Sequence, residues 1–232
     1  MKNQQRMFLI VLTILLVLAY PLITKAQKPP GYGIKAGMNL SGSSYNRYFS
    51  DSKSLKPGFQ VGITGEYALT KALFLQSEIA FTTKGVVYRG ADLWIGGTNP
   101  PVTHWKNTLD LLYVKAPLKL AYKFDMGSKI KLVVNAGAYA AYGVGAKDKT
   151  KNRYTGVERP ADTQSYYPFK EGVLRRFDTG AIAGLGVELG SLQLAINYEL
   201  GIRDIGKQMR DSSHDFEYHN QNISFTIGYA LK

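Results

Sequence analysis

The sequence has no cysteine among its 232 residues, which excludes a disulfide framework, a thiolate metal site and a thiol nucleophile. Proline is scarce, with 9 residues, whereas glycine is abundant, with 24. With 45% hydrophobic and 20% charged residues, this composition indicates a folded chain whose glycines suit curved, closely packed strands. The length fits a single all-β domain, because barrels of this size often form undivided domains.

Long apolar runs are also absent, except for one near the N-terminus. Residues 7–23 are uncharged and apolar, follow two basic residues and end beside small residues. This order is typical of a signal peptide. A transmembrane anchor is the alternative, but the run is short for a span and Pro21 interrupts it. We therefore predict a signal peptide over residues 1–26 and an exported domain over residues 27–232. Removal of the signal peptide would lower the formal net charge from +12 to +9.

Helical periodicity is absent after the signal peptide, and apolar and polar residues alternate instead with a period of two. Such alternation predicts strands with one apolar face. The pattern occurs in eight separate runs, at residues 31–40, 59–67, 73–81, 112–124, 130–145, 177–189, 192–203 and 223–231. The sequence therefore predicts an all-β fold of eight antiparallel strands.

All charges within these runs lie on one strand face, which is also rich in glycine, serine, asparagine and glutamine. The opposite face carries only apolar residues and tyrosine, together with an occasional serine or threonine. The charged residues of the polar face are Lys35, Glu66, Glu78, Lys115, Lys119, Lys123, Lys131, Asp178, Glu188, Glu199 and Arg203.

The predicted connections alternate between long and short. Three are short turns, near residues 69–71, 125–129 and 190–191, and four are long polar segments, at 42–55, 85–108, 147–176 and 204–221. Long loops count against a compact soluble domain. Alternating short turns and long external loops are typical of outer-membrane β-barrels, and an even strand number places both termini on the periplasmic side.

Two barrels fit this pattern, and they differ in the direction of the apolar face. In a lipocalin-like periplasmic barrel, that face would point inward and hold a ligand. In a transmembrane up-and-down barrel, it would point outward to lipid. The polar face has the small residues that a narrow lumen needs, and aromatic residues near the strand ends resemble interfacial girdles. The sequence therefore favours an outer-membrane barrel with its charges inside.

Charges inside a narrow barrel need partners, because an unpaired buried charge is costly. We predict a lumen charge network, in which Glu78 and Lys115 lie close together and Glu188 and Glu199 find cations nearby. A catalytic or proton-conducting carboxylate pair is the alternative reading. The predicted network consists of Lys35, Glu66, Glu78, Lys115, Lys119, Glu188, Glu199 and Arg203.

The third long connection is the most basic one, and it contains candidate contacts for lipopolysaccharide phosphates. Lysine and arginine suit phosphate groups at the outer leaflet, although a solvated loop is the simpler reading. The candidates are Lys147, Lys149, Lys151, Arg153 and Arg159. Trp94 and Trp105 in the second long connection are expected to pack the loop against the barrel rim.

Enzyme and metal signatures are few. The only histidines are His104, His214 and His219, all in predicted loops, and His214 and His219 flank two acidic residues. A metal site there is possible in principle, but solvated loop histidines are the expected reading. The sequence contains no nucleophile elbow, phosphate-binding loop or zinc-protease motif. We predict no cofactor, and export makes a nucleic-acid partner unexpected.

Five segments resemble the PorT-like outer-membrane β-barrel family of Gram-negative bacteria. They are GIKAGMNLS (33–41), PGFQVGITGEYAL (57–69), LFLQSEIAFTTKG (73–85), LLYVKAPLKLAYKF (111–124) and FDTGAIAGLGVEL (177–189). The resemblance covers residues 31–232 and implies a small barrel of the OmpA/OmpX type without an enzyme site. It rests on strand patterns, so it does not transfer the secretion and gliding role linked to the family's name.

Two positions depart from the pattern of that family. The fourth strand often carries an acidic residue where Lys115 stands here, which implies a rearranged charge network in the lumen. Outer-membrane barrels also usually end in an aromatic residue read by the barrel-assembly machinery, whereas this sequence ends at Leu231 and Lys232.

The expected function is therefore a structural or interaction role in the outer membrane, without enzymatic activity. The lumen should be filled by polar side chains, and the external loops should form the contact surface. Expected partners are outer-membrane lipid, lipopolysaccharide, the assembly machinery and a protein at the loops. A periplasmic ligand-binding barrel and a barrel-embedded enzyme are the alternative functions.

Overall fold

The computed structural model describes residues 31–44, 52–93, 102–127, 129–155, 162–206 and 217–231. The predicted signal peptide lies outside these residues. Nine strands are present in the described part of the chain. They are β1 (Gly31–Ser43), β2 (Ser52–Ala68), β3 (Leu73–Leu93), β4 (Val102–Gly127), β5 (Ile130–Thr155), β6 (Asp162–Tyr166), β7 (Phe177–Leu189), β8 (Leu192–Gly201) and β9 (Asn220–Leu231).

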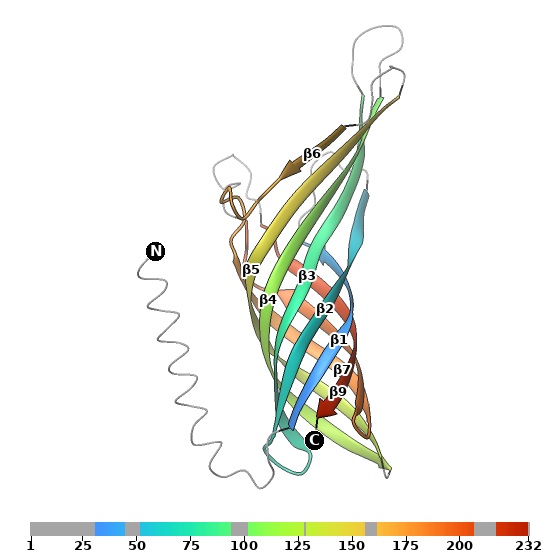
Figure 1. The fold of residues 1–232 in the computed structure, drawn as a ribbon, viewed down its shortest axis with the longest axis vertical. Coiled ribbons are helices and arrows are strands. Elements are labelled where there is room, and N and C mark those ends of the chain that lie inside the picture. Colours follow the sequence, from blue (N-terminus) through green and yellow to red (C-terminus); the bar gives the residue numbers. More distant parts are fainter. Residues whose placement is uncertain are drawn as a thin grey trace, which may run out of the picture.

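Eight of these strands form a closed barrel (Figure 1). All pairings are antiparallel, and neighbouring strands follow the chain order except where β5 pairs with β7. The pairing of β1 with β9 joins the first and last strands, and the pairing of β4 with β5 completes the ring. The short β6 pairs with the upper part of β5 and lies outside the ring. The predicted eight-stranded up-and-down barrel is therefore confirmed, with one additional external strand.

The short turns lie at one end of the barrel, as predicted. In the β2–β3 turn, the Thr70 hydroxyl accepts hydrogen bonds from the backbone amides of Ala72 and Leu73, at 3.3 and 2.9 Å. The two-residue β7–β8 turn begins at Gly190, whose φ of 64° is in the left-handed region. Glycine adopts this conformation without a steric penalty, which explains how so short a turn can reverse the chain.

Three strands continue much further than the alternation predicts. β3 continues to Leu93, β4 begins already at Val102, and β5 continues to Thr155. Most of the loop predicted at 85–108 and the first part of the loop predicted at 147–176 are therefore strand. The extensions project beyond the rest of the barrel (Figure 1). The prediction of loops there was wrong because these strand segments lie beyond the lipid-facing part of the barrel. Neither of their faces meets lipid, so the alternation of apolar and polar residues fades. We call the strand segments 86–93, 102–110 and 146–155, together with β6, the external sheet.

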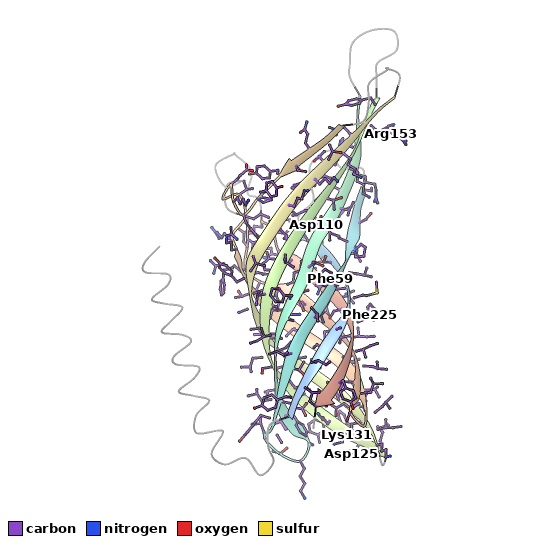
Figure 2. All side chains as sticks on the ribbon, in the orientation of Figure 1. Phe59, Asp110, Asp125, Lys131, Arg153 and Phe225 are labelled. Carbon is purple, nitrogen blue, oxygen red and sulfur yellow. The ribbon has the colours of Figure 1, made fainter. Side chains whose placement is uncertain are left out.

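The outer face of the barrel is apolar. Ile63 and Ile227 are 61% and 60% exposed, and large apolar side chains protrude from every strand of the ring. Aromatic residues on this face include Phe59 of β2 and Phe225 of β9, which flank Met38 of β1 from its two sides (Figure 2). A lipocalin-like barrel would turn this face inward, so that alternative is not favoured. The exposed belt is the surface that a membrane barrel presents to lipid.

The buried core lies inside the external half of the barrel. It combines inward-facing residues of β3, β4, β5 and β7 with residues from the connections that follow β6 and β8. Its members are Val86, Tyr88, Leu109, Leu111, Tyr113, Tyr139, Ala141, Phe169, Leu174, Ile182, Ile205 and Tyr218, which we call the apolar seal. The lumen therefore has two parts, one with ion pairs near the short turns and one toward the external sheet, where the apolar seal packs beside buried polar residues such as Ser43 and Asn220.

Candidate functional site

The centre of the lumen holds a four-membered ion-pair network that joins opposite walls of the barrel. Lys84 of β3 lies 3.3 Å from Asp178 of β7 and 3.1 Å from Glu199 of β8. Lys115 of β4 also pairs with Glu199 and donates a hydrogen bond to Gln60 at 3.2 Å. The four charged side chains are at most 2% exposed. Two cations thus balance two carboxylates in a site without contact with bulk water.

Neutral groups complete this central network. The Tyr139 hydroxyl and the Asn220 side-chain amide donate hydrogen bonds to the Asp178 carboxylate, at 3.3 and 3.0 Å. The Lys84 ammonium also lies 4.3 Å from the centre of the Tyr139 ring, which is a cation–π distance. These contacts link the network to the apolar seal directly above it.

A second network lies near the short turns. Lys123 of β4 bridges Glu66 of β2 and Glu188 of β7, with both ion pairs at 2.6 Å. Gln76 donates to Glu66 at 2.8 Å, and Gln193 donates to Glu188 at 3.2 Å. This cluster has one cation for two carboxylates, so its local formal charge is −1.

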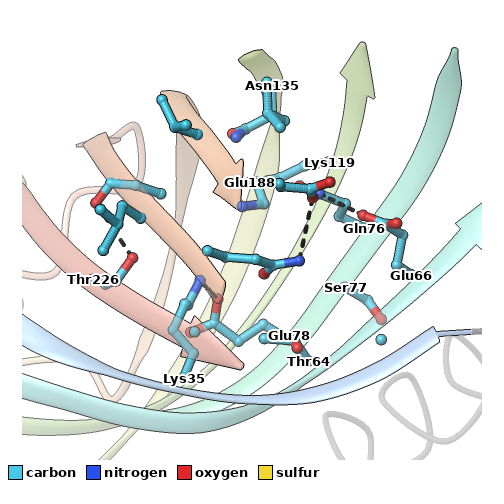
Figure 3. Close-up of a pocket in the computed structure, with 18 residues that line it drawn as sticks. Lys35, Thr64, Glu66, Gln76, Ser77, Glu78, Lys119, Asn135, Glu188 and Thr226 are labelled. Carbon is cyan, nitrogen blue, oxygen red and sulfur yellow. Dashed lines mark hydrogen bonds and ion pairs between the residues drawn. The ribbon is translucent and has the colours of Figure 1, made fainter. Parts of the chain in front are cut away.

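Between the two networks lies a small cavity. Lys35 of β1 pairs with Glu78 of β3 at its wall, and Lys119 of β4 also lines it (Figure 3). Lys119 is 6% exposed and forms no ion pair with the residues that the structure describes. The cavity volume is about 60 Å³, which is enough for a few water molecules but far below the roughly 300–1,000 Å³ of ordinary ligand pockets.

Above the central network, Phe169 closes the lumen from the external side. It comes from the connection after β6 and enters the barrel against Gly143 of β5, where any side chain would clash with the Phe169 ring. Its ring packs edge-on against Tyr113 of β4, with 5.9 Å between ring centres. Gly143 therefore makes room for a side chain that another residue would exclude.

Backbone hydrogen bonds hold this closure in place. The Arg175 amide donates to the Ile205 carbonyl at 2.7 Å, and the Ile205 amide donates to the Tyr218 carbonyl at 3.0 Å. These bonds join three segments from two connections, the one after β6 and the one after β8, over the lumen. We call the described segments 167–176, 202–206 and 217–219 the lid. Burial raises the pKa of the Tyr218 hydroxyl well above its ordinary value, so this side chain stays neutral under the lid.

The outer face of the external sheet is basic. Lys106, Lys151, Arg153 and Arg89 are exposed there, and Lys149 is half-exposed. They come from three neighbouring strands, because β4 pairs with both β3 and β5. Of the residues predicted as a basic loop, Lys147, Lys149, Lys151 and Arg153 are thus held in strand β5.

The structure places most of the predicted lumen residues inside the barrel but pairs them differently. Glu78 contacts Lys35, whereas Lys115 contacts Glu199. The predicted Glu78–Lys115 pair is therefore wrong, because the observed register brings Ala80 rather than Glu78 opposite Lys115. Arg203 is also not in the lumen. β8 ends at Gly201, and Arg203 is exposed beside the Phe177 ring, 5.2 Å from its centre.

Other candidates fall outside the lumen or outside the described residues. Arg159, Trp94 and His214 are among the residues that the structure does not describe. Trp105 is half-buried and packs against the apolar seal, as predicted. Lys84 was missed because it lies three residues beyond the end of the predicted run 73–81, although continued alternation from Glu78 would have placed it inside.

No group of histidine, aspartate or glutamate side chains suited to a metal ion occurs within the described ranges. His219 lies 3.5 Å from Glu217 and has no further acidic partner there. In the same ranges, no helix is both long and apolar enough to cross a membrane.

Comparison with known proteins agrees with this architecture. The family model described as "Outer membrane protein beta-barrel domain" matches residues 25–206, and the chain belongs to this family. The protein therefore resides in the cell outer membrane, with its apolar belt in lipid. No curated protein matches the chain.

Several solved outer-membrane proteins are similar to this chain at low sequence identity. They include Ail of Yersinia pestis in complex with the heparin analogue sucrose octasulfate (14% identity, 88% of this chain and 100% of Ail covered, TM-score 0.38). Neisserial surface protein A has 13% identity, with 87% and 99% covered and a TM-score of 0.40. OprG of Pseudomonas aeruginosa has 13% identity, with 89% and 98% covered and a TM-score of 0.39.

Proposed function

We propose that the protein is a non-conducting, non-enzymatic barrel that presents the external sheet as its working surface. The observation that carries this proposal is the closure of the lumen at two levels. The apolar seal lies above the ion-pair network of Lys84, Lys115, Asp178 and Glu199, and both fill the cross-section with buried side chains. An eight-stranded barrel has an interior just wide enough for such filling.

Solute passage would require both levels to open. The remaining cavity of about 60 Å³ lies on the side of the short turns and is separated from the exterior by the network and the seal. An ion crossing the seal would lose its hydration among apolar side chains, which is costly. A steady pore is therefore not expected.

Enzymatic activity has little support among the described residues. Each lumen carboxylate, including Glu78, Glu188 and Glu199, is engaged by a lysine. A general acid or base needs a substrate within hydrogen-bond distance, and the cavity beside these groups is too small to hold one. The ion pairs instead serve to hold opposite walls together.

The external sheet supports an interaction role. β4 and β5 pair continuously from Val102–Thr155 down to Gly127–Ile130, apart from local bulges. Such an ordered extension beyond the lipid belt offers a preformed surface, which lowers the entropy cost of binding.

The similarity to PorT-like barrels is more specific than membership of the outer-membrane β-barrel family, and it stays a prediction. It is carried by strand segments such as 33–41 and 177–189, whose residues build the barrel wall. These segments contribute to the fold and not to the external sheet. We therefore propose no secretion role on this basis.

Planar-bilayer recording of the refolded full-length mature protein tests the proposal. The wild type should insert without producing a steady conductance. The variant Phe169→Gly/Leu174→Gly, which opens only the seal, should also lack a steady conductance, because the ion-pair network still closes the lumen. A steady current from this variant would show that the network is not a barrier. A steady ohmic conductance of the wild type, like that of an open porin, would contradict the proposal.

A further inference from the structure

We propose that the basic outer face of the external sheet binds the phosphate groups of an anionic glycolipid of the outer leaflet, that is, lipopolysaccharide. This inference rests on the proposed function, since it names a partner for the external sheet. The surface, which we call the cation face, is formed by Arg89, Lys106, Lys149, Lys151 and Arg153.

Strand register aligns three of these cations in one row. Arg89 of β3 stands directly opposite Lys106 of β4, and Lys106 stands directly opposite Lys151 of β5. Neighbouring strands are about 4.8 Å apart, and residues two apart along a strand are separated by about 7 Å. Lys149 and Arg153 flank Lys151 on the same face of β5, so the five cations form a compact two-dimensional array.

A bulge in β5 directs its basic residues outward. Tyr113 pairs with Gly143 and Leu112 pairs with Gly145, which leaves Val144 as an extra residue. An extra residue changes which residues of the following strand face inward. Beyond the bulge, Asp148 accordingly faces inward to accept a hydrogen bond from Asn107, while the odd-numbered lysines face outward.

The cation face lacks acidic partners among the described residues. Lys106, Lys149, Lys151 and Arg153 form no ion pair there, and Arg89 donates a hydrogen bond to the Ser54 hydroxyl at 2.8 Å. The exposed carboxylate of Asp110, at the lower border of the external sheet, already pairs with Lys56 at 2.6 Å. Like charges directly opposite each other destabilise a sheet, and bound anions would remove this repulsion.

The position of the five cations relative to the membrane surface favours an outer-leaflet glycolipid over other anionic partners. The apolar belt ends on β5 with Tyr142 and Val144, which are 55% and 45% exposed, and Lys149 follows five residues after Val144. Asp110 marks this border in Figure 2, and Arg153 lies further from the membrane. The cations therefore begin directly above lipid, where phosphates of an outer-leaflet glycolipid lie, and lysine and arginine are suited to bind several phosphates at once.

A fluorescence titration tests this inference on the refolded mature barrel in detergent. Trp105, on the same part of β4, supplies a local signal. The probes are purified lipopolysaccharide, the same glycolipid with its phosphates removed, phosphatidylglycerol micelles and inorganic phosphate. The test variant is Arg89→Gln/Lys106→Gln/Lys151→Gln. The matched control, Lys71→Gln/Lys129→Gln/Lys131→Gln, removes the same charge from the opposite end of the barrel, where these residues lie in or beside the short turns.

We expect the test variant to bind lipopolysaccharide about tenfold more weakly, since each exposed ion pair contributes a factor of about two to five. The control variant should bind like the wild type, and the wild type should bind the phosphate-free glycolipid as weakly as the test variant does. Higher salt should reduce the difference, because exposed charges are screened. If the test variant does not fold, as judged by its mobility before and after boiling, Lys149→Gln/Arg153→Gln provides the same comparison.

Equal binding of glycolipid with and without phosphate would overturn the inference, as would an unchanged affinity of the test variant. Equally tight binding of phosphatidylglycerol or of inorganic phosphate would overturn the choice of glycolipid. None of these results changes the conductance of the wild type, so failure of this inference is distinguishable from failure of the proposed function.

Discussion

The two halves of the lumen are filled in opposite ways. Near the short turns and at the centre, lysines and carboxylates pair across the barrel, as Lys115 and Glu199 do. Toward the exterior, aromatic and aliphatic residues such as Tyr113 and Phe169 pack against each other. The same strands β4 and β5 line both halves, so the difference comes from side-chain choice within one backbone.

This difference affects how each half responds to substitution. A buried ion pair depends on both partners, because loss of one leaves an uncompensated charge in a water-poor site. An apolar contact is lost gradually, with a cost that depends on how far its surroundings can close the gap. The charged half is therefore expected to be the more sensitive, and the following substitutions test this contrast in order of expected effect.

Glu199→Ala should have the largest effect, with a loss of about 3–5 kcal/mol in the free energy of unfolding. It removes the carboxylate that both Lys84 and Lys115 contact. Urea titration in lipid vesicles, followed by the mobility change on boiling, measures this loss. The double variant Lys115→Met/Glu199→Leu should lose much less, since Lys84 keeps Asp178. If the double variant is as unstable as the single one, pairing is not the cause.

Ile196→Arg should cost about 2–4 kcal/mol, as expected of a cation at the lipid face near the membrane centre. Ile196 is 51% exposed and stands opposite Phe225. The same unfolding measurement applies, and Ile202→Arg is the control, because Ile202 follows the end of β8. An equal effect at both positions would contradict the assignment of the lipid belt.

Phe169→Ala should lower the free energy of unfolding by about 2 kcal/mol, which is less than is usual for a buried phenylalanine. The reason is that the lid can detach while the strands stay paired, so part of the cost is confined to local opening. Hydrogen exchange should show faster exchange at the Arg175 amide, which bonds to Ile205. A cost as large as that of Glu199→Ala would remove the contrast between the two halves.

Lys131→Ala should have the smallest effect, within about 0.5 kcal/mol, because exposed ion pairs contribute little. Lys131 and Asp125 lie 3.9 Å apart, and their side chains are 43% and 77% exposed. This substitution sharpens the comparison by changing an ion pair without changing a buried one. A loss of several kcal/mol in the same urea titration would show that burial is not what makes the lumen pairs sensitive.

The barrel wall was predictable because every strand in it separates lipid from lumen. That constraint gives a strict period of two, so the facing of Ile63, Glu78 and Glu199 followed from the sequence alone. The ion-pair partners of the lumen residues could not be predicted from the sequence, because a one-residue difference in register between β3 and β4 separates Glu78 from Lys115. The long connection between these strands carries no information that fixes the register.

The external half was poorly predictable for a different reason. Leu109 and Leu111 continue the inward alternation of β4, but their outward neighbours no longer face lipid and are not uniformly apolar. The contribution of Phe169 and Ile205 depends on connections that return to the barrel, and local patterns do not encode such long-range contacts. The alternation places Gly143 on the inward face, but only the packed Phe169 ring explains why this position holds a glycine.

Closure of the lumen is the central claim, and a single introduced cysteine tests it directly because the chain has none of its own. Ser224 of β9 is 1% exposed, faces the lumen opposite Asn39 and Asn197, and its hydroxyl has no hydrogen-bond partner among the described residues. Ser224→Cys in lipid nanodiscs is treated with a charged thiol reagent, with Lys151→Cys as the exposed reference. We predict that the lumen cysteine stays unlabelled while the reference reacts completely, and that it reacts after unfolding. Labelling of folded Ser224→Cys as fast as the reference would contradict a closed lumen.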